Sequence, residues 1–415
     1  MNALHAGKPA ILGGPRAVTM DGEEANRWPL LTAEDEAAVL NVIRHGDLSL
    51  HPVTRELEDD YRMRCGRRHA LAHCNGTAAM LAAFFALNLE PGDEILVPSA
   101  THWASVLPML WTGAVPVFCE SEPERMGLDA VDVERRVTPR TRAMVVVHLW
   151  GMPARMAELR AVAARHKLKV LEDASHAHGA TWHDTPCGAL GDVSVFSLQS
   201  SKLAPAGEGG ILLTDDDALY ERAICLGDMV RIAELETPAL RFAGTSFGVK
   251  TRIAPLSAAI AHVQLRHLDE RNAVRNANIE YLSVKLERLG FHTFLSPVDV
   301  QRVYFEFLVR YDEKDLGLPI GTLLKALAAE GCDVSWPRYP LLHQQPFFTE
   351  GHSARIARTG TPPPEYRPDA LPRTEAFSAC LLKLPSFPRA SRELLDQYAV
   401  AFEKILSHAY ALGKA

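Results

Sequence analysis

Two apolar runs of the sequence end in residues that could do chemistry. Val170–Leu171 leads into an acidic pair that ends at Asp173, and Val193–Phe196 leads through a polar turn to Lys202. Parallel α/β sheets hold their ligands at the carboxyl ends of such strands. The stretch 204–210 contains two alanines, one proline and three glycines. Such tight surroundings could desolvate the lysine amine and turn it into a nucleophile.

A nucleophilic lysine beside a carboxylate favours one cofactor. We interpret Lys202 as the Schiff-base lysine of pyridoxal 5′-phosphate (PLP), with Asp173 pairing with the pyridinium nitrogen. The two segments resemble the DegT family of aminotransferases. Its acidic strand end reads Glu-Asp, two small residues, Gln or His, two variable residues and Gly, as in 172–179. Its lysine segment reads Phe-Ser, four variable residues, Lys and then Gly-Glu-Gly-Gly, as in 196–210.

The resemblance extends over about residues 10–410 and implies a fold. DegT enzymes are fold-type I PLP-dependent proteins of the α/β class. We therefore expect a large PLP-binding domain, residues 1–265, with an N-terminal arm and a mostly parallel, doubly wound sheet. A smaller C-terminal α+β domain is expected at 266–415.

The resemblance also implies an activity. The expected enzyme is a PLP-dependent aminotransferase that moves an amino group from an amino acid, glutamate or glutamine, to a keto sugar or keto-cyclitol. Such enzymes serve the biosynthesis of secondary metabolites, including antibiotics, or of cell-surface sugars. The implied catalytic residues are Lys202, Asp173 and His176, the last matching the Gln or His that contacts the cofactor's 3-oxygen. Ser197 matches a phosphate ligand, and Gln199 occupies a position where some aminocyclitol enzymes also have Gln.

A strand-to-helix turn supplies the expected phosphate site. Asn75-Gly76-Thr77 opens a strongly apolar helix, and the free N–H groups and dipole of a helix N-terminus attract phosphate. An ordinary helix cap has the same sequence. The family has a Ser-Gly-Thr-like turn here, so the resemblance assigns Gly76, Thr77 and Ala78 to the phosphate.

The family stacks an aromatic ring on the cofactor from a Pro-Ser-x-Thr-aromatic segment. Aligned on Pro98 and Thr101, that position is His102. A shift of one residue in the loop would place Trp103 there instead, so the two rings stay alternatives. Trp103 is also a candidate substrate contact.

Segment 248–252 resembles a Gly-x-Asn-x-Arg stretch whose Asn reaches the phosphate in the partner subunit. This chain has Lys250 there, which could bind phosphate as a point charge. A homodimer with shared active sites is therefore expected. Farther on, the loop 336–348 resembles a family loop, and its Arg338 and His343 could face the substrate or simply be solvated.

The composition and charge of the chain bear on its partners, its location and its capacity to bind a metal. A net charge of −7 over 415 residues gives no support for nucleic-acid or anionic-membrane partners. No run approaches the roughly 20 apolar residues of a membrane-spanning helix, and the start does not resemble a signal peptide, so we expect a cytoplasmic protein. Seven cysteines without a CxxC spacing do not indicate a metal site.

Three functions other than an aminotransferase have sequence requirements that can be compared with this chain. Sugar dehydratases of this fold replace the lysine with His, whereas this chain has Lys202. A non-catalytic regulatory protein would be expected to lose Lys202 or Asp173. A Rossmann NAD enzyme would need a Gly-x-Gly-x-x-Gly turn after a strand, which the sequence does not have.

The pattern of apolar residues along the chain predicts the strands and helices that position these side chains. Apolar runs at 69–72, 95–97, 113–118 and 141–147 predict further buried strands, and the helices between them predict a doubly wound parallel sheet. A single long amphipathic helix is expected over 257–286. The alternating stretch 302–311 predicts a strand.

Overall fold

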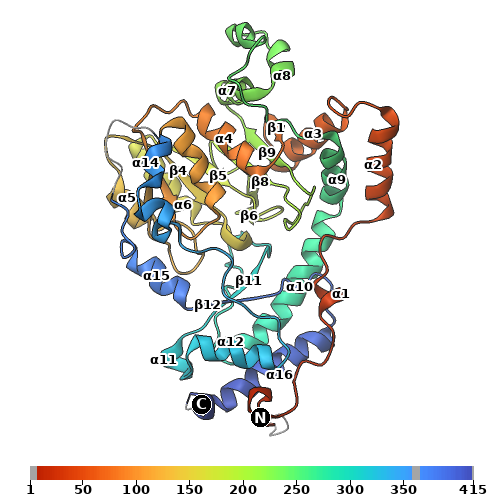
Figure 1. Cartoon of the computed structure of the whole chain (residues 1–415), viewed down its shortest axis with the longest axis vertical. Helices are drawn as coiled ribbons and strands as arrows, with labels where there is room; N and C mark the ends of the chain where they lie inside the picture. The colour runs from red at the N-terminus through yellow and green to blue at the C-terminus, as the bar shows by residue number, and fades with distance from the viewer. Residues whose placement is uncertain (1–6, 358–364, 414–415) are drawn as a thin grey trace.

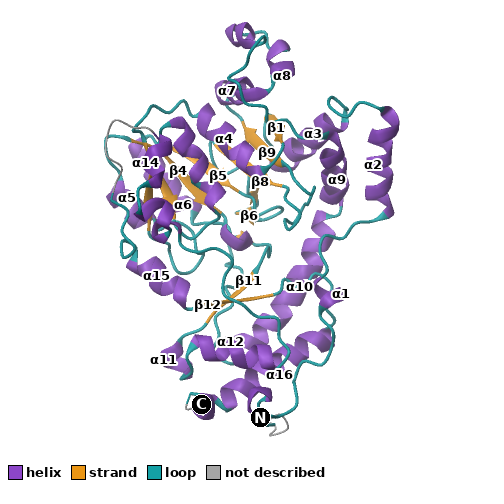
Figure 2. Cartoon of the chain, viewed as in Figure 1, coloured by secondary structure: helices purple, strands orange, loops and turns teal. Residues whose placement is uncertain are grey.

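The computed structural model describes residues 7–357 and 365–413. A large sheet covered by helices occupies the upper part of the view in Figure 1, and a smaller unit built around α10 (Leu268–Glu287) lies below it. Coloured by secondary structure, most strands gather in the upper unit with helices around them, and β11 (Phe307–Arg310) and β12 (Leu381–Leu384) lie below (Figure 2). No helix in the described ranges is long and apolar enough to cross a membrane.

The large sheet has seven strands in the order β1-β9-β8-β5-β4-β2-β3. They are β1 (His69–His73), β2 (Glu94–Pro98), β3 (Val115–Cys119), β4 (Thr141–Val147), β5 (Lys169–Asp173), β8 (Val193–Ser197) and β9 (Gly210–Thr214). The five strands from β8 to β3 run parallel, and β9 runs antiparallel to both of its neighbours. The expected mostly parallel sheet is therefore confirmed.

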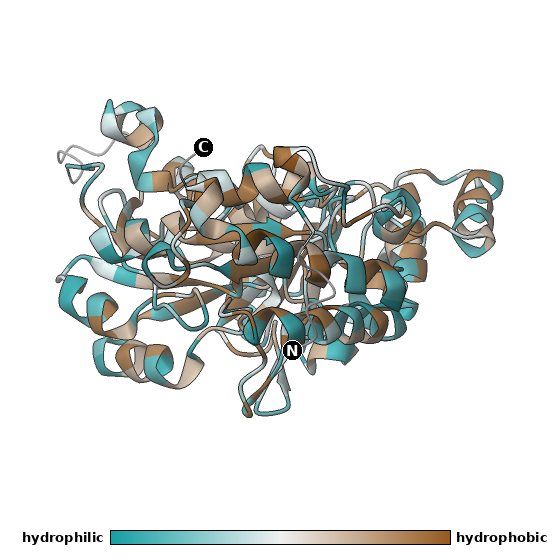
Figure 3. Ribbon diagram, turned by 90° about the horizontal axis from the view of Figure 1, so that it is seen from below, coloured by the Kyte–Doolittle hydropathy of each residue, from teal (hydrophilic) through white to brown (hydrophobic). Residues whose placement is uncertain are grey.

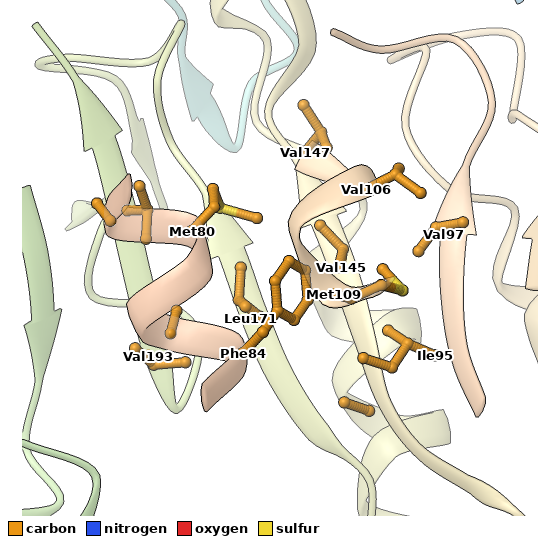
Figure 4. Close-up of a cluster of buried hydrophobic side chains, with 14 of the residues drawn as sticks. Met80, Phe84, Ile95, Val97, Val106, Met109, Val145, Val147, Leu171 and Val193 are labelled. Carbon is orange, nitrogen blue, oxygen red and sulfur yellow. The ribbon is translucent and has the colours of Figure 1, made fainter. Parts of the chain in front are cut away.

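Helices cover both faces of this sheet, which is why the middle residues of its strands are largely apolar. One face carries α4 (Gly76–Ala86), α7 (Asp217–Gly227) and the 3₁₀ helix η3 (Leu107–Thr112). Figure 4 shows Met80 and Phe84 of α4 packed with Leu171 and Val193 of the sheet. The other face carries α3 (Val53–Cys65), α5 (Ala130–Arg136), α6 (Met156–His166) and α9 (Pro255–Arg266). Hydrophobic residues accordingly run through the middle of the molecule in Figure 3.

The smaller unit packs helices on a two-stranded antiparallel sheet. Its elements are α10, α12 (Ile320–Ala329), α16 (Arg392–Ser407), β11 (Phe307–Arg310) and β12 (Leu381–Leu384). The start of the chain joins this unit, because Val18 lies in its core and Glu330 accepts hydrogen bonds from the N–H groups of Ala10 and Ala17, each at 2.8 Å. Phe348 lies in the C-terminal half of the chain, but its side chain belongs to the core of the large unit.

Short elements complete the fold. They are α1 (Glu23–Asn26), α2 (Ala33–His45), α8 (Met229–Ala233), α11 (Glu313–Leu316), α13 (Pro346–Thr349), α14 (His352–Ala357), α15 (Pro372–Ala379), α17 (Ala409–Leu412), β6 (Thr181–Trp182), β7 (Thr185–Pro186), β10 (Val300–Gln301), η1 (Ala10–Leu12), η2 (Trp103–Ser105), η4 (Leu149–Gly151), η5 (Pro238–Phe242) and η6 (Leu342–Gln344).

The single helix predicted over 257–286 is wrong, because the structure has two. The helices α9 and α10 are separated at His267, whose φ of −92° and ψ of 0° end the first helix. Neither proline nor glycine marks the break. Its cause is tertiary packing: α9 packs against α2 and α3, whereas α10 packs against α16.

The strand predicted over 302–311 is too long. Only Phe307–Arg310 forms β11. The N–H groups of Val303 and Phe305 bond instead to the carbonyls of Gly151 at 3.1 Å and Trp150 at 3.2 Å. These long-range bonds fix residues 303–305 beside the large unit, where Phe305 reaches the site described below.

Candidate active site

A cavity of about 670 Å³ lies at the carboxyl ends of β5 and β8 and beside the first turn of α4. Its walls bring together ten of the residues that the sequence singled out. They are Gly76, Thr77, His102, Trp103, Asp173, His176, Ser197, Gln199, Lys202 and Arg338. Segments from residue 76 to residue 338 therefore converge on one space of the size that binds cofactors.

Lys202 is buried in this cavity, in the turn between β8 and β9. Its side-chain nitrogen lies 4.3 Å from the centroid of the Phe305 ring. Burial, together with the nearby Arg338 cation, lowers the pKa of Lys202 to about 8, although Asp173 acts in the opposite direction. A lysine with this pKa has a useful fraction of neutral, nucleophilic amine near neutral pH.

The backbone of Lys202 is tied in place from two sides. Its N–H bonds to the carbonyl of Gln199 at 2.8 Å. Its carbonyl accepts a hydrogen bond of 2.9 Å from the indole N–H of Trp28. Contacts to the turn and to the N-terminal segment therefore fix where the amine is delivered.

Asp173 is the last residue of β5, and two donors hold its carboxylate. Ser105 donates from Oγ to Oδ2 at 2.6 Å, and the N–H of Ser175 donates to Oδ1 at 3.0 Å. The hydroxyls of Thr101 and Ser105 lie 2.9 Å apart. Because Ser105 donates its proton to Asp173, its oxygen accepts from Thr101. These hydroxyls and Asp173 are all buried, so the carboxylate keeps one orientation.

Glu172, the other member of the acidic pair, points away from the cavity and serves the fold. It is fully buried and accepts N–H groups of Leu190 at 2.8 Å and Gly191 at 2.9 Å, while His148 Nε2 lies 3.0 Å away. Successive residues of a strand face opposite sides of a sheet, so only Asp173 can serve the site.

His176 forms one layer of an aromatic stack. Its ring lies nearly parallel to Phe305 at 4.2 Å, and Trp150 and Tyr339 extend the stack. Burial, and after it the charge of Lys202, holds the pKa of His176 well below its usual value, so the ring is neutral. Nδ1 accepts the N–H of Trp150 at 3.3 Å, which leaves the proton on Nε2, 3.2 Å from the Tyr339 hydroxyl.

The first turn of α4 forms an anion cradle. Helix geometry leaves the N–H groups of Gly76 and Thr77 without intrahelical acceptors. A Cβ atom at Gly76 would lie 2.7 Å from Ser197 Cβ, so only glycine permits this close approach. The N–H of Ala78, in contrast, donates to Asn75 Oδ1 at 2.8 Å. The N-cap residue Asn75 therefore already accepts the N–H of Ala78, and Ala78 does not line the cavity. Gly76 and Thr77 do line it.

His102 and Trp103 both line the cavity, so both stay candidates for ring stacking. Their ring centroids lie 5.0 Å apart. The His102 Nδ1 atom accepts the N–H of Ala104 at 3.2 Å. Burial and the charge of Lys202 lower the pKa of His102, which favours a neutral ring.

Besides Ala78, two candidates lie outside the cavity lining. His343 is buried, with Nδ1 2.7 Å from Ser99 Oγ and Nε2 3.1 Å from Glu375. The loop thus turns Arg338 towards the cavity and His343 into the protein, so that only Arg338 lines the cavity. Lys250 is exposed on the surface and does not line the cavity of its own chain.

Four residues in or next to the cavity were not among the sequence predictions for the site. Ser105 and Tyr339 line the cavity, Phe305 lies under Lys202, and Glu306 pairs with Arg338. Only Glu306 left a signal, as a charged residue within an otherwise apolar alternating stretch. The others are common core or turn residues whose role depends on distant segments.

Comparisons with known proteins agree with this geometry. The chain is 34% identical over 381 residues to dTDP-3-amino-3,4,6-trideoxy-alpha-D-glucose transaminase of Streptomyces venezuelae, covering 91% of this chain and 93% of the relative. It is 34% identical over 349 residues, 82% of each chain, to a Streptoalloteichus tenebrarius protein assigned as an L-glutamine:3-amino-2,3-dideoxy-scyllo-inosose aminotransferase. It is 33% identical over 353 residues, 85% of this chain and 89% of the relative, to GDP-perosamine synthase of Caulobacter vibrioides.

Solved structures show the same fold. DesV of S. venezuelae, in complex with a ketimine intermediate, has a TM-score of 0.75 at 32% identity, covering 95% of this chain and 99% of DesV. DesI with its TDP-sugar product has a TM-score of 0.79 at 28% identity, covering 96% of each chain. The match to the family itself spans residues 29–402. The chain therefore belongs to the DegT/DnrJ/EryC1/StrS aminotransferase family, as the segments around Asp173 and Lys202 predicted.

Proposed function

We propose that this aminotransferase uses PLP to move the amino group of glutamate or glutamine to a keto sugar or keto-cyclitol. The observation that carries the proposal is the buried Lys202, with its lowered pKa, in the same cavity as Asp173. The relatives named above support the acceptor class, because they are named for amino sugars and an amino-inosose.

The residues of the cavity fit the cofactor. The amine of Lys202 is suited to hold its aldehyde carbon, and the carboxylate of Asp173 to hold its ring nitrogen. The N–H groups of Gly76 and Thr77, beside Ser197, fit a phosphate, since a helix N-terminus favours anions. When bound, PLP supplies an electron-poor ring that takes up the electron pair released when the donor's α-proton leaves.

Each residue then has a task that follows from its position. Lys202, whose amine would be free once the donor is bound, would take the proton from the donor's α-carbon and return it during the transfer. Asp173, fixed by Ser105, keeps the proton on the ring nitrogen. The stacked rings of His176, Phe305 and Tyr339 would form a rigid aromatic wall beside the reacting atoms.

Gln199 belongs to the wall of the proposed acceptor site. Its amide donates to Ser200 Oγ at 2.8 Å, and its carbonyl oxygen accepts from Ser201 Oγ at 2.7 Å. These bonds hold a neutral amide at the cavity, which suits a polyhydroxylated acceptor such as a cyclitol or free keto sugar.

A homodimer with shared active sites is part of this proposal. Trp111, Phe247 and Val249 are exposed around a surface cavity of about 630 Å³. An exposed apolar patch of this kind marks an interface. Lys250 directly follows Val249 of this patch in the sequence, so it would lie at the interface with a second copy seated there.

The donor half-reaction tests the function. Mixed with L-glutamine or L-glutamate alone, the PLP-loaded protein should convert its yellow cofactor to colourless pyridoxamine phosphate, and an inosose or keto sugar should restore the colour. Lys202→Ala, which removes the proton carrier, should do neither. Consumption of a keto sugar without any amino acid, and no response to amino donors, would instead support the dehydratase alternative.

A further inference from the structure

Arg338 forms part of the cavity wall and is anchored from inside the protein. Its Nε lies 2.5 Å from Glu306 Oε1. The carboxylate of Glu306 is buried, and its second oxygen has no hydrogen-bond partner among the described residues. The arginine side chain itself is 44% exposed. One side of the guanidinium is therefore tied to the protein, and its two terminal nitrogens are left for a ligand.

Arg338 also lies close to the reactive lysine. The Lys202 nitrogen is 4.3 Å from the centroid of the Phe305 ring, and the guanidinium carbon of Arg338 is 5.5 Å from that same centroid. Next to burial, Arg338 is the strongest influence that lowers the pKa of Lys202. Because both residues line the same cavity, a small molecule attached at the lysine position shares that cavity with the guanidinium.

The proposed reaction places an anion in this position. The nitrogen of an amino-acid donor replaces the Lys202 nitrogen, and its carboxylate carbon lies about 2.5 Å from that nitrogen. A carboxylate held in a cavity needs a cationic partner. Lys202 and Arg338 are the only lysine and arginine that line the cavity in the described part of the chain. Lys202 must be neutral to carry the donor's proton, so it cannot serve as the cation.

We propose that Arg338 binds the α-carboxylate of the amino donor through its two terminal nitrogens. This inference rests on the aminotransferase function proposed above and names the donor subsite. A guanidinium matches a carboxylate in a bidentate geometry that a lysine cannot reproduce. The diphosphate of a nucleotide-linked acceptor is the other anion with this chemistry, and the experiment must separate the two.

The test compares donors that differ only in the α-carboxylate. L-Glutamine and its decarboxylated analogue, 4-aminobutanamide, are titrated against PLP-loaded wild type, Arg338→Gln and Arg338→Lys. The apparent dissociation constant comes from the cofactor's spectrum, and the conversion rate at saturation is measured separately. Arg338→Gln should weaken L-glutamine binding by roughly 10- to 100-fold, the value of hydrogen bonds between charged groups, but leave 4-aminobutanamide unchanged. Arg338→Lys should bind L-glutamine with an affinity between those of the wild type and Arg338→Gln.

Binding without turnover gives a second readout. An α-methylated glutamate has no α-proton to lose, and its affinity should fall in Arg338→Gln by the same factor as that of L-glutamine. The matched control is Arg288→Gln, an exposed arginine at the end of α10, which should bind all ligands as the wild type does. Binding of dTDP by calorimetry should be equal in all variants.

Two results would overturn the inference. Arg338→Gln could bind L-glutamine as tightly as wild type, or it could lose dTDP instead and so assign Arg338 to a nucleotide-linked acceptor. Either result leaves the aminotransferase function intact, provided that wild type still converts its cofactor with an amino acid. Failure of the wild type to do so would contradict the proposed function itself.

Discussion

Ser105 donates a hydrogen bond of 2.6 Å to Asp173, and Thr101 completes a buried chain of hydroxyls behind it. The two ends of the Ser105–Asp173 bond come from segments 68 residues apart. The bond fixes the carboxylate at the point where β5 ends. In the proposed function, this is the group that holds the ring nitrogen of PLP.

Removing this hydroxyl should weaken cofactor binding. Ser105→Ala deletes a donor to a buried carboxylate, which is worth about 1.5–3 kcal/mol, so the dissociation constant for PLP should rise about tenfold or more. Ser105→Thr keeps the hydroxyl and should bind PLP nearly as the wild type does. Titration of the apoprotein with PLP, followed by absorbance, measures both. Equal affinity of Ser105→Ala and wild type would show that the bond does not support the cofactor.

The pKa of Lys202 predicts how attachment of the cofactor depends on pH. Burial lowers this pKa to about 8, so the neutral amine is scarce at pH 6 and abundant at pH 9. The rate at which the apoprotein takes up PLP should therefore rise with pH and level off above about 8. Stopped-flow absorbance at several pH values gives the midpoint. A midpoint near the ordinary lysine value of 10.5 would contradict the buried environment.

The phosphate cradle depends on a glycine. In Gly76→Ala, the new Cβ would lie 2.7 Å from Ser197 Cβ, so the first turn of α4 must shift. PLP affinity should fall at least tenfold, whereas binding of pyridoxal, which has no phosphate, should change little.

Gly321 of α12 offers the control for this substitution. A Cβ there meets no atom within 4 Å, so Gly321→Ala should leave PLP affinity unchanged. Because alanine favours helix more than glycine does, the control substitution should not destabilise the fold. If Gly76→Ala lost affinity for PLP and pyridoxal equally, the substitution would have distorted the whole cavity, and the phosphate site would not be supported.

Mixed dimers test the shared active site. If Lys250 serves the partner's site, a dimer of one Lys202→Ala chain and one Lys250→Ala chain has one site with both defects and one with neither. Co-expressed mixed dimers should therefore regain part of the activity that each homodimer lacks. No recovery, or a fully active monomer by sedimentation, would contradict the arrangement.

The sequence predicted those parts of the site that depend on local patterns. Asp173 and Lys202 each follow a short apolar run, and Gly76 opens an apolar helix, so neighbouring residues are enough to recognise them. The parallel strands were predictable for the same reason, since each is buried on both faces and reads as a continuous apolar run.

Features that depend on distant contacts were not predictable. The inward turn of His343 follows from Ser99, 244 residues earlier in the chain, and the pairing of Arg338 with Glu306 joins a loop to a strand end. The break at His267 has no local breaker and reflects which helices pack on either side. Such contacts cannot be predicted from the residues that lie next to each segment in the sequence.

The central claim is that Lys202 holds PLP, and borohydride reduction tests it most directly. The protein reconstituted with PLP should be yellow, and reduction should remove the colour and fix the cofactor to its lysine. Peptide mass spectrometry should then place the reduced pyridoxyl group on Lys202. A colourless protein that takes up no PLP, or a modification on a different lysine with Lys202 unmodified, would contradict the account.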